Sequence, residues 1–177
     1  MIFVLTGAVH SGKTTSLEKI IHNLGKENSR IDGYLSKALL ENQEIIGYDL
    51  FDLREERSAP FIRRQGEEDW ERVGSYSFNP QGLSRAKSII LRGTKADILV
   101  VDEVGPLELA GKGIWPALEK VLFLPKPHFI LAVRKRILGD FIALIESQDV
   151  QIFDTDDVGF SERMIQEVKR IAICGPS

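Results

Sequence analysis

The chain alternates between short apolar runs and amphipathic stretches, a pattern typical of parallel α/β proteins. Residues 2–5 read Ile-Phe-Val-Leu, and similar apolar runs recur along the chain. A strand in a parallel sheet is buried on both faces, so its sequence reads as a continuous apolar run rather than an alternating one. We therefore predict core strands at 2–5, 31–35, 98–101, 129–133 and 150–153.

Helices are predicted between these strands from apolar residues at helical spacing. Asn79 and Pro80 form a good helix start, with asparagine as the N-cap and proline at the first helical position. Gly25 and Gly93 are expected to end their helices. The alternation predicts a parallel sheet with right-handed crossovers, with helices marked by apolar positions at 17–24, 83–90, 114–122, 141–145 and 164–172.

Residues from about 44 to 78 interrupt this alternation. The stretches 45–52, 58–63 and 74–78 favour short strands of antiparallel appearance, whereas 54–72 is rich in charged residues. Dense charge is typical of a solvated segment. We expect a β-hairpin insertion here that covers or borders the functional site, with the charged part as a mobile lid or a solvated decoration.

Composition narrows the class of protein. The chain has 177 residues, 43% apolar and 28% charged, and carries a formal net charge of −3, so we expect one globular domain over 1–177. The net charge of a slightly acidic chain does not favour binding to nucleic acid or to an anionic membrane. No apolar run approaches the ~18 residues of a membrane span. We expect a cytoplasmic monomer. The chain has one cysteine, Cys174, so an intrachain disulfide is excluded.

The strongest motif follows the first strand. Residues 7–14 read Gly-Ala-Val-His-Ser-Gly-Lys-Thr, which matches the phosphate loop G-x-x-x-x-G-K-[ST]. In such a loop backbone N–H groups surround the phosphates, Lys13 reaches the β- and γ-phosphates, and the Thr14 hydroxyl ligates Mg²⁺. The predicted nucleotide-binding residues are Gly7, Ala8, Val9, His10, Ser11, Gly12, Lys13, Thr14 and Thr15. The His10 side chain is either solvent-facing, the interpretation we favour, or in contact with the triphosphate.

A second acidic motif ends a predicted core strand. Residues 98–103 read Ile-Leu-Val-Val-Asp-Glu, four apolar residues followed by two carboxylates. Asp102 is predicted to help hold Mg²⁺. Glu103 lies at the carboxyl end of the strand, where ligands bind in open α/β sheets. We predict that Glu103 orients and deprotonates the water that attacks the γ-phosphate.

Two segments also resemble motifs of guanine-nucleotide-binding proteins. Residues 102–105 fit D-x-x-G, and Thr94-Lys-Ala-Asp97 fits a loose guanine-binding motif. The second motif precedes the first, however, whereas the order is reversed in GTPases. We therefore favour an ordinary helix-to-strand connection at 94–97.

Over nearly its whole length the chain resembles the small P-loop nucleoside-triphosphatases called cancer-related nucleoside-triphosphatases. The resemblance rests on Gly7–Thr15, Gly33-Tyr34, Gly47-Tyr48, Val73–Tyr76 and, most specifically, Val100–Glu108. It implies a three-layer, RecA-like fold of the additional-strand type with a mostly parallel sheet. It also implies Mg²⁺-dependent hydrolysis of nucleoside triphosphates such as ATP or GTP, with broad base tolerance, and marks Glu108 as a second acidic position.

The chain departs from the family pattern at three places. It has Gly-Tyr-Leu-Ser-Lys-Ala at 33–38 where the family often has Gly-Phe-x-Thr-x-Glu, Ile45 where the family often has arginine, and His10 where glycine is common. These departures avoid Lys13 and the acidic pair at 102–103. They therefore bear on substrate preference and turnover more than on nucleotide binding.

Hydrolysis is the predicted function, and two alternatives stay open. A kinase would pass the γ-phosphate to a small acceptor, with the arginine-rich 54–72 as a lid that excludes water. A non-enzymatic nucleotide switch would use the same loop without needing Glu103. The sequence names no arginine finger, because a surface charge is the favoured interpretation for Arg63, Arg64, Arg134 and Arg136.

Overall fold

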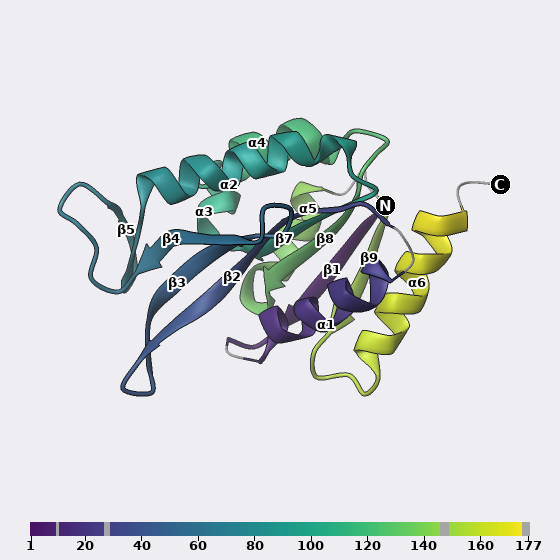
Figure 1. Ribbon diagram of the computed structural model, residues 1–177, viewed down its shortest axis with the longest axis horizontal. Helices are drawn as coiled ribbons and strands as arrows, with labels where there is room; N and C mark the ends of the chain where they lie inside the picture. Colours follow the sequence, from purple (N-terminus) through teal and green to yellow (C-terminus); the bar gives the residue numbers. More distant parts are fainter. Residues whose placement is uncertain (10, 27–28, 146–148, 175–177) are drawn as a thin grey trace.

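The computed structural model describes residues 1–9, 11–26, 29–145 and 149–174. One mixed sheet lies between two layers of helices, which is the predicted three-layer α/β architecture (Figure 1). Its strand order across the described chain is β5-β6-β4-β3-β2-β7-β8-β1-β9. No helix in these ranges is both long enough and apolar enough to cross a membrane.

One half of the sheet is parallel and corresponds to the five predicted core strands. These are β2 (Ile31–Glu41), β7 (Ile98–Val104), β8 (His128–Arg134), β1 (Ile2–Gly7) and β9 (Val150–Asp154), and each pairs in parallel with its neighbour. All six residues of β1 are buried. The apolar runs therefore identify the strands correctly, because helices cover both faces of β1, β7 and β8, although the edge strand β9 is only partly buried.

The other half of the sheet is antiparallel and comes from the inserted segment. It contains β3 (Glu44–Asp52), β4 (Arg57–Arg63), β5 (Glu71–Val73) and β6 (Tyr76–Phe78). Only β3 and β6 run against β2, and the other strands of the described chain share its direction, so the predicted mostly parallel sheet is confirmed. The short strands expected at 58–63 and 74–78 are confirmed as β4 and β6, whereas the solvated segment expected at 54–72 was wrong for 71–72, which belong to β5. Strand β2 is also longer than predicted, since it pairs with β3 from Tyr34 to Glu41.

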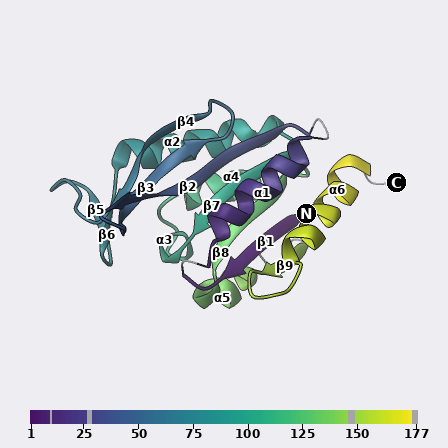
Figure 2. The same cartoon turned by 60° about the horizontal axis from the view of Figure 1, so that its bottom comes forward.

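Helices cover the two faces of the sheet in separate groups (Figure 2). On one face lie α2 (Pro80–Arg92), α3 (Pro106–Leu109), α4 (Trp115–Leu122) and α5 (Leu138–Leu144), and on the other lie α1 (Lys13–Gly25) and α6 (Phe160–Cys174). Single 3₁₀ turns follow α2 at Gly93–Lys95 and β8 at Lys135–Ile137.

The helix boundaries confirm most of the predicted capping. The Asn79 side chain accepts hydrogen bonds from the N–H groups of Gln81 and Gly82, and Gly93 follows the end of α2. Gly25 is the last residue inside α1, and the C-cap is the next residue, Lys26, so the helix ends one residue later than a C-cap at Gly25 predicts. The four-residue helix α3 went unpredicted because it is too short to show a helical period.

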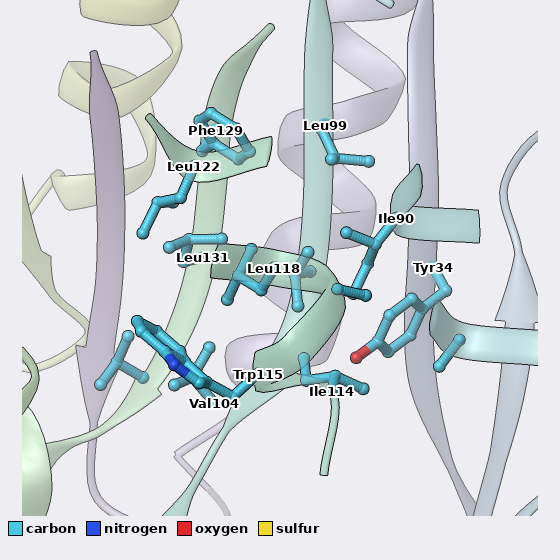
Figure 3. Packing of buried hydrophobic residues seen from close by; sticks show 14 of the residues in the cluster. Tyr34, Ile90, Leu99, Val104, Ile114, Trp115, Leu118, Leu122, Phe129 and Leu131 are labelled. Atoms are coloured by element: carbon cyan, nitrogen blue, oxygen red, sulfur yellow. The ribbon is translucent and has the colours of Figure 1, made fainter. Parts of the chain in front are cut away.

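Two apolar cores hold the layers together. The first joins the sheet to α2 and α4, where Ile90, Leu118 and Leu131 are fully buried (Figure 3). The second joins the opposite face to α1 and α6, with Phe3 and Leu17 fully buried. The apolar face of every long helix is thus covered by the sheet, which positions the first turn of α1 at the carboxyl ends of the parallel strands.

Strand β7 contains a bulge at the second of its two carboxylates. Asp102 pairs with Ala132 and Val104 with Val133, so Glu103 has no partner of its own in the ladder. The φ angle of Glu103 is +93°, a conformation that costs a residue with a Cβ roughly 1–3 kcal/mol. Bulges of this kind re-aim a side chain at the rim of a sheet. Here the surrounding sheet holds a strained carboxylate at a strand end.

The charged edge of the antiparallel half is fixed by an ion-pair network around Asp52, which is fully buried. Asp52 accepts hydrogen bonds from the N–H groups of Arg54 and Glu55 and from the guanidinium of Arg92, with Arg85 at 3.4 Å. Burial alone would raise the pKa of Asp52, but the hydrogen bonds from Arg92 and Glu55 outweigh it and hold the pKa below its ordinary value. The network therefore ties the end of β3 to helix α2.

The strain at Glu103 predicts an unusual order of stabilities. Glycine adopts positive φ without a steric penalty, whereas alanine keeps the strain. Urea unfolding should therefore give Glu103→Gly a free energy of unfolding about 1 kcal/mol above that of Glu103→Ala. Ala59, in β4 with an ordinary backbone, is the control, since Ala59→Gly should lower the free energy of unfolding. An alanine variant as stable as the glycine variant would show that the backbone at Glu103 is unstrained.

The Asp52 network predicts a pH-dependent loss of stability. Because its pKa is lowered in the folded state, Asp52 stabilises the protein above its unfolded pKa of about 4 and loses that contribution as the pH falls through the folded value. Asp52→Asn should cost about 3 kcal/mol at neutral pH, since it removes one of the two buried carboxylates that pair with Arg92, the other being Asp32, and clearly less near pH 3. Glu44→Gln breaks an exposed pair with Arg64 and should cost under about 1 kcal/mol. Equal costs for Asp52→Asn at both pH values, measured by urea unfolding, would contradict the assignment.

Candidate active site

A cavity of about 480 Å³ opens at the carboxyl ends of β1, β7 and β8. Its wall combines the end of the phosphate loop with the two carboxylates of β7, namely Val9, Ser11, Gly12, Lys13, Thr14, Thr15, Asp102 and Glu103. Helix α1 begins at Lys13, so its free N–H groups face this cavity. An unpaired helix N-terminus favours an anion. The structure thus brings together the two motifs that the sequence predicts to act together.

The loop backbone is shaped by its two glycines. Gly12 precedes α1 with φ of 80°, in the left-handed region. Gly7 has φ of 155°, and a Cβ there would collide with the side chains of Thr155 and Ser11. The Thr155 hydroxyl also contacts the Ser11 hydroxyl at 3.0 Å. The segment after β9 therefore packs against the loop and fixes its path, a support that the sequence pattern did not reveal.

Lys13 folds back onto its own loop. Its ammonium group donates hydrogen bonds to the carbonyl oxygens of Gly7 at 3.1 Å and Ala8 at 2.7 Å. Burial lowers the pKa of Lys13, while the nearby Asp102 carboxylate opposes that shift. Gly7 and Ala8 thus hold the lysine rather than line the cavity. The lysine is the loop's own mobile cation, already placed at the edge of the space where an anion would bind.

Thr14 and Asp102 are in direct contact across the cavity. The Thr14 hydroxyl donates to Asp102 Oδ2 at 2.8 Å, and the Ser36 N–H donates to the same oxygen at 2.9 Å. Burial raises the pKa of Asp102 to about 6, although the hydrogen bonds from Ser36 and Thr14 favour its charged form. The Ser36 hydroxyl is buried without a hydrogen-bond partner among the described residues. Ser36 occupies the threonine position of the family pattern, so this hydroxyl could have been recognised from sequence.

These oxygens suit a hard cation that is shared with a phosphate. Mg²⁺ prefers oxygen ligands and keeps several waters, with one or two carboxylates and substrate phosphates completing its shell. Thr14 and Asp102 offer one hydroxyl and one carboxylate beside the anion-binding loop. No group of three or more potential side-chain ligands clusters anywhere in the described ranges. The donor set therefore fits a metal that arrives with a nucleotide better than a permanent metal cage.

Glu103 faces Arg134, the last residue of β8. The Arg134 guanidinium donates to Glu103 Oε1, and both side chains are partly buried in the cavity wall. Burial and the nearby Arg136 lower the pKa of Arg134. The interpretation of Arg134 as a plain surface charge was therefore wrong. The signal that could have found it is its place at the end of a core strand adjacent to β7.

Glu108 has a different role from the carboxylates of β7. It is 6% exposed, and its two carboxylate oxygens accept hydrogen bonds from the N–H groups of Gly105 at 2.8 Å and Ile114 at 3.1 Å. Burial raises the pKa of Glu108, although these N–H groups lower it. Glu108 therefore closes the loop around α3, and its carboxylate lies outside the described lining of the nucleotide cavity.

The structure also shows the place of Thr94–Asp97, the segment that resembles a guanine-binding motif. Asp97 precedes β7 and forms a two-pronged ion pair with Arg30, with side-chain contacts of 2.9 and 3.2 Å. It lies at the amino end of the strand, whereas Asp102 and Glu103 lie at the carboxyl end. Thr94–Asp97 is therefore a structural connection far from the cavity, as the favoured interpretation held.

The inserted segment borders the cavity through β3 and β6 and not through the charged stretch 54–72. Ile45, Tyr48 and Tyr76 contribute to the wall, whereas none of the described lining residues comes from 54–72. Arginines of this segment pair with sheet carboxylates instead, as Arg63 does with Asp49 at 2.6 Å. The predicted border is confirmed, and the arginine-rich lid is not seen. His10 lies outside the described residues.

Comparison with known proteins agrees with this geometry. The family described as NTPase matches residues 2–169. The chain is 30% identical to nucleoside-triphosphatase THEP1 of Thermofilum pendens over 156 residues, which cover 85% of this chain and 84% of that protein. It is 33% identical to nucleoside-triphosphatase THEP1 of Methanopyrus kandleri over 135 residues, covering 75% and 74% of the two chains.

Two solved structures share the fold. THEP1 from the hyperthermophile Aquifex aeolicus superposes with a TM-score of 0.76 at 20% identity, covering 96% of this chain and all of that one. A human cancer-related nucleoside triphosphatase superposes with a TM-score of 0.72 at 22% identity, covering 94% and 95%. The family match spans nearly the whole chain, including the phosphate loop and the segment 100–108. The chain therefore belongs to the NTPase family.

Proposed function

We propose that the protein hydrolyses nucleoside triphosphates to nucleoside diphosphate and phosphate with the help of Mg²⁺. The observation that carries this proposal is the convergence of Lys13, the Thr14–Asp102 pair and Glu103 on one cavity at the start of α1. The relatives named nucleoside-triphosphatase support the same reaction.

The phosphate loop supplies the binding energy. Its N–H groups and the first turn of α1 surround the α- and β-phosphates, and Lys13 exchanges its bonds to Gly7 and Ala8 for bonds to the β- and γ-phosphates. Charge-assisted hydrogen bonds of this type are about twice as strong as neutral ones. All of these groups recognise phosphate and none reads a base, so we expect ATP, GTP and other triphosphates to be accepted.

Thr14 and Asp102 would hold Mg²⁺, and Ser36 supports them. When bound, the ion would neutralise charge that develops on the β- and γ-phosphate oxygens. The Ser36 N–H fixes the orientation of the Asp102 carboxylate. The Ser36 hydroxyl, which lines the same cavity and has no partner among the described residues, would offer a further polar group beside the metal.

Glu103 orients the attacking water and accepts its proton. Strain and the bulge aim its carboxylate into the cavity, and Arg134 fixes its direction. Arg134 is thus a positioning residue that also places positive charge beside the developing negative charge. Such fixed charges act strongly where water is restricted. Water attacks the γ-phosphorus, the bond to the β-phosphate oxygen breaks, and the diphosphate leaves with the electron pair.

Hydrolysis is favoured over the two alternatives. A kinase must exclude water from the γ-phosphate. The charged stretch 54–72, which was expected to form such a lid, contributes no residue to the described cavity wall. A simple nucleotide switch has no need for a strained carboxylate in that wall. The single sheet, with cores on both faces, further supports one domain acting as a unit.

Exchange of Glu103 for glutamine tests the reaction. Glu103→Gln keeps the shape but not the basicity, so we expect phosphate release about 10²–10⁴-fold slower. Binding of a Mg²⁺-bound non-hydrolysable triphosphate should stay within a few-fold of wild type. Glu18→Gln is the matched control, because Glu18 lines the same cavity and pairs only with Lys37 in the described chain. Turnover of Glu103→Gln at the wild-type rate would refute the water-activating role.

Removal of the loop lysine tests the binding mode. Lys13→Ala should weaken binding of a non-hydrolysable triphosphate about 10- to 100-fold, because hydrogen bonds to charged groups contribute roughly 1.5–3 kcal/mol. Lys37→Ala removes another cation of the same cavity wall and should change affinity much less. Isothermal titration calorimetry measures both. If folded Lys13→Ala binds as tightly as wild type, Lys13 is not a phosphate ligand.

A further inference from the structure

A second cavity, of about 380 Å³, adjoins the nucleotide cavity on the far side of Glu103. It lies between the antiparallel strands and the segment that carries α3. The two cavities share Tyr48, Tyr76, Glu103 and Arg134 as common wall. Hydrolysis needs only water besides the nucleotide, so the proposed reaction does not account for this space.

Aromatic rings form much of its wall. Tyr34 and Phe61 meet edge to face with centroids 5.9 Å apart, and Phe61 and Phe78 do so at 6.0 Å. Tyr48 and Tyr76 lie at 5.8 Å in a tilted arrangement. These rings are in contact with one another, and the parts of them that line the cavity can make the same kind of contact with the ring of a ligand. The volume falls within the range of pockets that take small organic ligands.

One wall residue has an unused polar group. Tyr34 is fully buried, and its hydroxyl has no hydrogen-bond partner among the described residues. The hydroxyl points toward Ile114, which also lines the cavity (Figure 3). A buried hydroxyl without a hydrogen-bond partner is energetically unfavourable. A ligand with its own hydroxyl in the cavity would satisfy it.

The cavity wall also contains charged side chains, and one of its guanidinium groups is unpaired among the described residues. Arg136 is exposed, lines the cavity and has no ion pair in the part of the chain that the structure describes. Arg134 pairs with Glu103, and both oxygens of Glu108 are engaged by backbone N–H groups. The wall thus has two guanidinium groups and two carboxylates, and the Arg136 guanidinium is the one of the four without a side-chain or backbone partner among the described residues, so it can pair with an anionic ligand.

We propose that this cavity is a second ligand-binding site, for a small planar aromatic carboxylate with a ring hydroxyl. The ring lies among the aromatic side chains, the hydroxyl meets Tyr34, and the carboxylate meets Arg136. This binding does not depend on the proposed hydrolysis. Its coupling to the nucleotide does, because the bound anion would lie close to Arg134 and the γ-phosphate. Like charges at the shared wall should weaken each other's binding by the same factor.

Ligand-observed NMR titration of the nucleotide-free protein tests the site. The probes are para-hydroxybenzoate, para-hydroxyphenylacetate and their counterparts without the hydroxyl. We expect saturable binding of at least one hydroxylated probe, weakened about tenfold by Arg136→Gln. Arg57→Gln is the matched control, since Arg57 is exposed on β4 and does not line the cavity.

A second variant tests the proposed hydrogen bond between the Tyr34 hydroxyl and the ring hydroxyl of the ligand. Tyr34→Phe should weaken the hydroxylated probe but leave its counterpart without the hydroxyl unchanged. It should not destabilise the fold, because the Tyr34 hydroxyl has no partner to lose. Failure of every probe to saturate, or equal affinities in wild type, Arg136→Gln and Tyr34→Phe, would overturn the proposal.

The coupling is measured on the same protein. A Mg²⁺-bound non-hydrolysable triphosphate should raise the Kd of the probe several-fold, and ADP, which lacks the γ-phosphate, should raise it less. Equal effects of the two nucleotides would refute the proposed coupling between the γ-phosphate and the second site. If the triphosphate does not bind at all, the proposed function fails, whereas the second site is still decided by the nucleotide-free titration.

Discussion

Consecutive residues of a regular strand face opposite sides of a sheet, and the candidate site depends on an exception to that rule. Asp102 and Glu103 both line the nucleotide cavity. They can do so because β7 is bulged between Asp102 and Val104 and because Glu103 adopts positive φ. The metal-binding and water-activating roles proposed for neighbouring residues therefore require backbone strain. That strain is tolerated because the parallel strands on both sides are buried and paired.

The sequence predicts those parts of the fold that local chemistry determines. A strand buried on both faces must be apolar throughout, so the five core strands are visible as runs. The phosphate loop can be recognised in the sequence because it needs glycine at fixed positions. At Gly7, for example, a Cβ would collide with the Thr155 side chain. The segment that supports the loop, around Thr155, shows no such signal. Its contact with Ser11 spans 144 residues, and a single sequence does not display pairings of that range.

The errors have a common physical cause. Charge density in 54–72 indicated solvent exposure, yet Arg63 of this segment pairs with Asp49 of β3 at 2.6 Å. A charged residue that is paired inside a fold looks the same in sequence as one in water. Arg134 was misjudged for the same reason, because its partner Glu103 is 31 residues away. The bulge at Glu103 was equally hidden, since glutamate carries no propensity for positive φ.

The two cavities divide recognition between different kinds of group. In the proposed function, the nucleotide cavity binds through backbone N–H groups, Lys13 and oxygen ligands, all of which recognise phosphate and not the base. Such a site would gain affinity for any triphosphate and little selectivity. The second cavity offers aromatic side chains, a buried hydroxyl and a guanidinium that has no ion pair among the described residues, and the proposed ligand would be recognised by its shape and polarity. Because Glu103 and Arg134 belong to both walls, a molecule in the second cavity would meet the groups that act on the γ-phosphate. Selectivity absent from the phosphate loop can therefore enter through the neighbouring space.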